Sequence, residues 1–138
     1  MTLTLEELYG KWLNHPDATK ECKEDSEQFL VLVNALMKTM NDDGFSFKIN
    51  PLTGSVVGGE TFGGFRPQSC PIGAPQSAHK LGRACDLYDP DNAIDSWLTA
   101  HPLAVNSIEL YFEHPQATPY WSHWSDRKPG SGRKFFMP

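Results

Sequence analysis

Two histidines and one aspartate have side chains that could hold a metal ion in this chain of 138 residues. The segment SAHKLGRACD contains His79 and Asp86, and His123 follows in the aromatic segment YWSHW. Each of the other three histidines precedes a proline, which is typical of turns and of the ends of elements. Zinc binds imidazole nitrogen and carboxylate oxygen at about 2.0 to 2.2 Å, and a catalytic site uses three protein ligands plus water. His79, Asp86 and His123 are therefore candidate zinc ligands.

The segment RACDLY around Asp86 has the composition of a strand, and Gly82 permits a close turn before it. Successive side chains of a strand point to opposite faces, so Cys85 points away from the face that carries Asp86. This geometry argues against a cysteine hydrolase that would pair Cys85 with His79.

The ten residues from Ser77 to Asp86 match every position of the pattern S-x-H-x-x-G-x-A-x-D. The chain thereby resembles the D-alanyl-D-alanine carboxypeptidase and dipeptidase class of zinc peptidases, and through it the zinc-bearing domain of hedgehog signalling proteins. In that class the pattern supplies a histidine and an aspartate ligand, and a histidine on a later strand completes the site. The resemblance implies a zinc cofactor on His79, Asp86 and His123. From residue 62 onward the chain also looks like small peptidase-like proteins of phage and prophage.

The resemblance implies two further site residues. GGFRP is similar to the strand whose arginine, here Arg66, faces the substrate. The dipeptidases carry a glutamate base three residues before the last histidine, where this chain has Tyr120. Hedgehog-like members carry their glutamate at the end of the preceding strand, where this chain has Glu113. Strand alternation places Glu109 on the same face, but Glu113 is nearer the turn and is the preferred base.

The function that the resemblance implies is zinc-dependent hydrolysis of a peptide bond in peptidoglycan, next to a D-amino acid. Glu113 would act as the base, and Arg66 would balance charge on the oxyanion or on a substrate carboxylate. Ser77 is either a substrate-binding residue or a simple turn hydroxyl.

Two alternatives remain open at this point. The chain could be a zinc-binding structural or binding module of the same fold that has lost its base, and Tyr120 favours this interpretation. It could also be a metal-free fold in which His79 and Asp86 form a hydrogen-bonded pair.

The elements that must position these residues begin with helices. A capping-box pattern and apolar residues at helical spacing predict a short helix over residues 4–13. A longer apolar stripe predicts a second helix over residues 26–43, with Ser26 as its cap. A third short helix is predicted within residues 89–102.

Short alternating runs broken by glycine and proline predict strands and turns over residues 45–67. Two further strands are predicted, over residues 108–113 and 120–124. The sequence thus predicts an α+β fold over a single domain, residues 1–138, with N-terminal helices packed on a small antiparallel sheet that carries the zinc site.

Composition and charge argue against some classes of binding partner. The net charge is -5 and the basic residues are scattered except near the C-terminus, so we expect no nucleic-acid partner. No apolar run reaches the roughly 20 residues that span a bilayer, and the acidic N-terminus is unlike a signal peptide. We expect a monomer without a membrane partner, made in the cytoplasm without a signal peptide and acting in the cell wall or in a phage particle. The three cysteines favour reduced thiols, with Cys70 and Cys85 as the one pair that could bridge.

Overall fold

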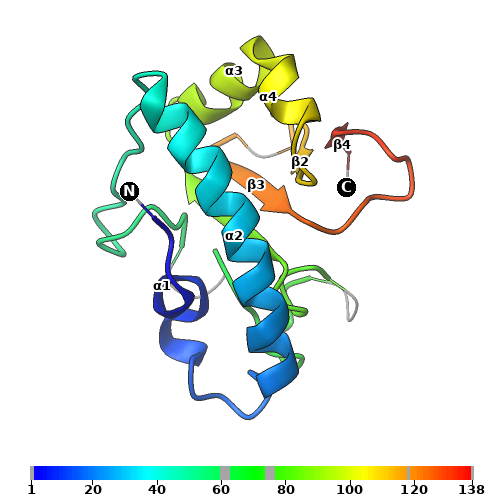
Figure 1. Ribbon diagram of the computed structural model, residues 1–138. Coiled ribbons are helices and arrows are strands. Elements are labelled where there is room, and N and C mark those ends of the chain that lie inside the picture. The colour runs from blue at the N-terminus through cyan, green and yellow to red at the C-terminus, as the bar shows by residue number, and fades with distance from the viewer. Residues whose placement is uncertain (1, 60–62, 74–76, 118, 138) are drawn as a thin grey trace.

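A four-stranded sheet lies against helices in the computed structural model, which describes residues 2–59, 63–73, 77–117 and 119–137 (Figure 1). The strands are β1 (Ala84–Tyr88), β2 (Tyr111–Glu113), β3 (Trp121–Ser125) and β4 (Phe135–Phe136), in the order β1-β3-β2-β4. The three strands β1, β3 and β2 are antiparallel neighbours, whereas β4 is parallel to β2. The α+β prediction is confirmed. The prediction of a wholly antiparallel sheet is wrong at β4, because the C-terminal segment returns beside β2.

The helices of the described residues are α1 (Leu5–Tyr9), the 3-10 turn η1 (Gly10–Trp12), α2 (Lys20–Asp42), α3 (Ala93–Ala100) and α4 (Pro102–Asn106). The capping box at Thr4 and Glu7 is present. Helix α2 begins six residues before the predicted start, with Thr19 as its cap. Ser26 is buried inside this helix, where its hydroxyl donates to the Gly82 carbonyl at 2.7 Å. None of these helices is both long and apolar enough to cross a membrane.

The hydrophobic core lies between α2 and one face of the sheet. Figure 1 shows α2 crossing over the strands, and its buried stripe includes Phe29, Val33 and Met37. This stripe belongs to the same buried cluster as Leu87 of β1 and Trp124 of β3. Because side chains alternate along a strand, the residues between these core positions point to the opposite face of the sheet.

The described residues of the segment 45–67 do not form the predicted strands. Within the described part of this segment there are only two isolated bridges, because its glycines and prolines interrupt regular pairing. The segment still follows the free edge of β1. The Gly58 amide donates to the Asp86 carbonyl at 2.7 Å, and the Asp86 amide donates to the Gly63 carbonyl at 2.6 Å. Both backbone groups of Asp86 are therefore held by this irregular segment.

Helix α3 carries a buried carboxyl group that faces the sheet. Asp95 is only 2% exposed, and its Oδ1 accepts a hydrogen bond from the Ser122 hydroxyl at 2.7 Å. Its other oxygen is buried without a hydrogen-bond partner among the described residues. Burial raises the pKa of Asp95 to about 6; the Ser122 hydrogen bond opposes this rise and the charge of Asp89 adds to it.

This carboxyl group makes stability depend on pH. The folded pKa of Asp95 lies above its ordinary value of 3.8, so the protonated form stabilises the fold below about pH 4, and this stabilisation is lost as the pH rises through about 6. From pH 4 to pH 7, the free energy of unfolding of Asp95→Asn should rise relative to wild type by about 1 to 3 kcal/mol. Urea unfolding of both proteins across this range measures the difference.

Asp42 is exposed, and Asp42→Asn serves as the control because it also removes one negative charge. A difference between Asp95→Asn and wild type that stays constant from pH 4 to pH 7 would contradict the assignment.

Candidate metal centre

Strand register places three polar side chains in a row across the sheet. Asp86 of β1 is directly opposite His123 of β3. Phe112 of β2 is opposite Trp124 in the core, so the next residue along β2, Glu113, lies beside His123 on the other face. The face of the sheet that is turned away from α2 thus carries Asp86, His123 and Glu113 on adjacent strands.

His79 approaches this row from the turn that precedes β1. Its Nδ1 is 2.8 Å from the carbonyl oxygen of Gly64. A carbonyl only accepts hydrogen bonds, so Nδ1 carries a proton and Nε2 is the nitrogen that faces Asp86 Oδ2, at 3.5 Å. Nε2 of His79 and Oδ2 of Asp86 are therefore two atoms that could bind the same metal ion.

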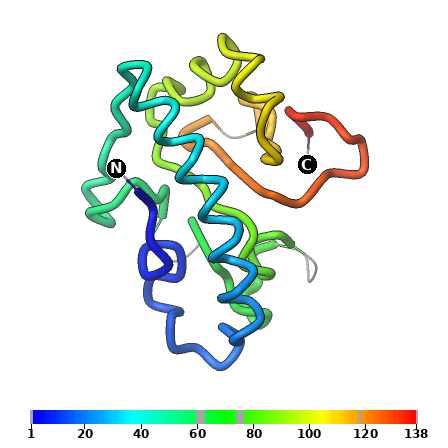
Figure 2. Tube along the Cα trace, in the orientation of Figure 1, coloured from blue at the N-terminus to red at the C-terminus, as the bar shows by residue number. Residues whose placement is uncertain are grey.

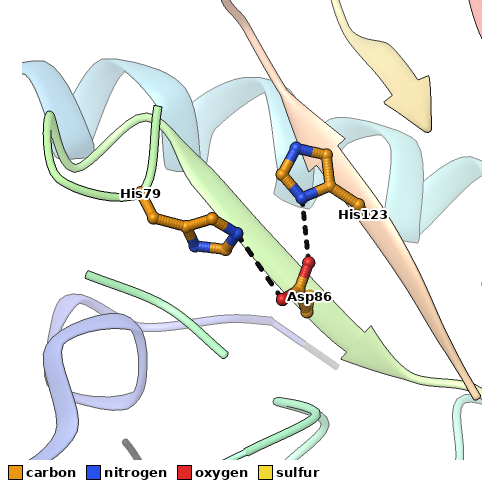
Figure 3. Close-up of side chains that lie close together, drawn as sticks. All are labelled: His79, Asp86 and His123. Atoms are coloured by element: carbon orange, nitrogen blue, oxygen red, sulfur yellow. Dashed lines mark hydrogen bonds and ion pairs between the residues drawn. The ribbon is translucent and has the colours of Figure 1, made fainter. Parts of the chain in front are cut away.

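Asp86 directs one carboxylate oxygen toward each of the two imidazole rings (Figure 3). The Nδ1 atom of His123 is 2.9 Å from Asp86 Oδ1 and 3.8 Å from Glu113 Oε2. Candidate ligand atoms from His79, Asp86 and His123 all lie within 4.8 Å of one another. Two ligands of a tetrahedral zinc ion are about 3.4 Å apart, given bonds of about 2.1 Å. The contacts of Asp86 with the two rings, at 2.9 and 3.5 Å, are near that spacing, so the group could in principle bind a metal ion.

The three residues are deeply buried, with 3% of His79, 8% of Asp86 and 8% of His123 exposed. Burial alone would raise the pKa of Asp86, but the charge of His79 and the hydrogen bond from His123 hold that pKa well below its usual range. Burial alone would lower the pKa of His123, but the hydrogen bond and charge of Asp86, with the charge of Glu113, raise it. Nδ1 of His123 donates its proton to Asp86, and a metal ion that binds this nitrogen must displace that proton. Metal binding should therefore release protons.

Arg66 and Ser77 lie in the wall of the cavity into which the group opens. The Arg66 Nη2 atom is 3.5 Å from Asp86 Oδ2, and the Arg66 backbone amide donates to the His79 carbonyl at 3.2 Å. A cavity of about 550 Å³, called the main cavity below, is open to solvent and is lined by both residues and by the His79, Asp86 and His123 group. A substrate could therefore reach the group through this cavity.

The residues considered for the catalytic base differ in their position relative to the main cavity. Glu113 lines the main cavity. Glu109 is exposed, lies outside that lining, and accepts a hydrogen bond from the Tyr111 hydroxyl at 3.1 Å. The expectation that Glu109 shares a strand face with Glu113 is wrong, because β2 begins only at Tyr111. Tyr120 is 66% exposed and does not line the cavity.

Several residues of the main cavity were missed by sequence reasoning. Phe136 of β4 lines it and has its ring centroid 6.2 Å from that of His123. Trp121, Arg127 and Lys128 line it as well. Arg127 and Lys128 belong to a group of basic residues near the C-terminus of the sequence. The position of Phe136 depends on the parallel pairing of β4 with β2, which no local sequence pattern indicates.

Cys85 lies on the core side of β1, fully buried, and burial raises the pKa of its thiol well above the usual value. All three cysteines are free. A buried thiol with a raised pKa is a poor nucleophile. We expect iodoacetamide to modify Cys85 in the native protein at least about tenfold more slowly than Cys22 and Cys70.

Mass spectrometry of digested protein after timed labelling measures the three rates, and labelling in guanidinium should make them equal. Native-state labelling of Cys85 at the rate of Cys70 would reopen the cysteine hydrolase interpretation.

The chain matches no protein-family model, and neither the curated proteins nor the solved structures include a significant match. The chemistry must therefore be argued from the site itself. The buried group of two imidazoles and a carboxylate could in principle bind a metal ion. Glu113 adds a carboxylate that can accept a proton beside that group.

Proposed function

We propose that this protein is a zinc-dependent peptidase that hydrolyses a peptide bond in peptidoglycan, adjoining a D-amino acid. The observation that carries the proposal is the buried His79, Asp86 and His123 group, with Glu113 beside it in an open cavity. The choice of substrate rests on the resemblance of SAHKLGRACD to the D-alanyl-D-alanine peptidase class. The cell wall or a phage particle would be the place of action.

Zinc would be held by Nε2 of His79, a carboxylate oxygen of Asp86 and Nδ1 of His123, the atoms that face one another. When bound, zinc polarises a carbonyl group and lowers the pKa of water toward about 7. The hydrogen bond from His79 Nδ1 to Gly64 fixes the ring so that Nε2 is free to act as a ligand.

The protein side chains supply the proton transfers and the charge balance. Glu113 takes a proton from the attacking water and delivers it to the leaving amine, while the C–N bond breaks and a C–O bond forms. The Arg66 guanidinium, already beside Asp86, stabilises negative charge that develops on the carbonyl oxygen. Ser77 contributes a hydroxyl to the cavity wall for binding substrate.

A zinc-binding module without catalytic activity is the second candidate. Tyr120 favours it, because the resembling dipeptidases have their base at that position. The location of Glu113 in the main cavity argues for the peptidase instead.

Digestion of purified peptidoglycan by zinc-loaded protein tests the proposal. We expect new amine ends and fragments whose masses identify a single cleaved bond, and we expect both to be absent with a chelator or with His123→Ala. A protein that holds zinc but leaves peptidoglycan and its soluble peptides intact would support the binding module. A protein that holds no zinc would contradict both candidates.

A further inference from the structure

Two cavities meet at the candidate metal centre. The first is the main cavity, and the second, of about 320 Å³, is called the glycine-lined cavity here. Both are lined by Arg66, Asp86 and Trp121. The remaining described lining of the second cavity consists of Gly58, Gly59, Gly63 and Ile72. His79, His123 and Glu113 line the main cavity and are not part of the described lining of the glycine-lined cavity. The candidate metal centre therefore opens into the main cavity, and the glycine-lined cavity adjoins it at Asp86.

The two cavities differ in charge. The loop that follows β3 brings Arg127 and Lys128 into the wall of the main cavity, and Figure 2 shows this segment running out beyond β3 before it turns back. The described lining of the glycine-lined cavity has only two charged residues, Arg66 and Asp86, and it shares both with the main cavity. The additional positive charge is thus confined to the main cavity.

The position of Glu113 sets the direction of the substrate. Glu113 lines the main cavity and is not part of the described lining of the glycine-lined cavity. The group that takes the proton from water must reach the leaving nitrogen to deliver it, over a hydrogen-bond distance or through one water. The leaving part of the substrate therefore lies in the main cavity, within reach of Glu113.

We propose that Arg127 and Lys128 form a carboxylate subsite for the leaving part of the substrate. This inference rests on the proposed peptidase function, because the direction of the substrate follows from the role of Glu113. A guanidinium pairs with both oxygens of a carboxylate, and a lysine adds a mobile positive charge. The carboxylate is either the free C-terminus of the substrate or a carboxylate on the side chain of its leaving residue.

Calorimetric binding to zinc-loaded Glu113→Gln tests the subsite without turnover. The probes are an acetylated tripeptide that ends in D-alanyl-D-alanine, its C-terminal carboxamide, and a carboxamide peptide that ends in D-glutamate. We expect the free carboxylate to bind about 10- to 100-fold more tightly than the D-alanine carboxamide, since a hydrogen bond to a charged group contributes about 1.5 to 3 kcal/mol. Recovery of affinity by the D-glutamate peptide would identify a side-chain carboxylate as an acceptable source.

When Arg127→Gln and Lys128→Gln are added to the Glu113→Gln protein, the carboxylate peptide should no longer bind more tightly than its carboxamide. A matched pair, Lys20→Gln with Arg133→Gln, removes the same charge outside both cavities and should leave the preference intact. Equal affinity for the carboxylate and carboxamide peptides, binding of neither, or a preference that survives the double substitution would overturn the subsite.

Hydrolysis by the protein with Glu113 intact separates this inference from the peptidase proposal. Cleavage of both D-alanine peptides at equal rates would leave the peptidase standing and overturn the subsite. Absence of cleavage, combined with a carboxylate preference that needs Arg127 and Lys128, would remove the peptidase and keep the subsite as a ligand-binding feature.

Discussion

Replacing Glu113 by glutamine is expected to lower kcat for peptide hydrolysis by about 10²- to 10⁴-fold while zinc stays bound. Glutamine keeps the size and hydrogen-bonding reach of the side chain, but its amide cannot accept the proton of the attacking water. The proposed zinc ligands are untouched, since Glu113 lies beside His123 at 3.8 Å and is not needed to complete the three-residue group. Rates measured together with zinc content separate loss of the base from loss of the metal.

Glu109→Gln is the matched control, because Glu109 is exposed and lies outside the main cavity. It should retain the activity of the wild type. Undiminished hydrolysis by Glu113→Gln, or a comparable loss in Glu109→Gln, would show that the base has been assigned to the wrong residue.

Gly64→Ala is expected to affect both folding and the metal centre. A Cβ atom at residue 64 would lie 1.9 Å from the carbonyl oxygen of Leu8, so backbone must move. The same carbonyl accepts a hydrogen bond from the Phe65 amide at 2.8 Å, while the Gly64 carbonyl holds the His79 ring. We expect a loss of about 1 to 3 kcal/mol in the free energy of unfolding, or more, and about 10- to 100-fold weaker zinc binding.

Chemical unfolding and zinc titration of the variant measure the two effects separately. Gly130→Ala provides the comparison, because a Cβ atom there would meet nothing within 4 Å. If Gly64→Ala does not fold without metal, stability measured with added zinc still reports the weakened binding. Wild-type stability together with wild-type zinc affinity would refute the role given to this contact.

Two of the three residues of the candidate metal centre could be placed close together from sequence because they belong to one short motif. His79 and Asp86 are seven residues apart in one motif, and strand alternation alone separates Asp86 from Cys85. His123 required only that a later strand pair with β1, and the register places it directly opposite Asp86. Their proximity is a property of the structure, whereas zinc binding by these residues remains a prediction.

The rest of the fold depended on contacts that local patterns do not contain. The first six residues of α2 are mostly polar and charged, so apolar periodicity could not reveal the start after Thr19. Residues 45–67 have strand-like composition, yet most of their described hydrogen bonds belong to turns and to the edge of β1. Part of the wall of the main cavity, residues 127–130 and Phe136, comes from the C-terminal segment, which ends in the parallel pairing of β4 with β2.

The amount of zinc that the protein binds tests the central claim most directly. Protein stripped of metal, titrated with zinc and analysed for bound metal after gel filtration should hold about one zinc ion per chain. His79→Ala and His123→Ala should each lose this ion, while His114→Ala, which alters a histidine outside the group, should keep it. No bound zinc in the wild type, or zinc that survives both His79→Ala and His123→Ala, would contradict the account.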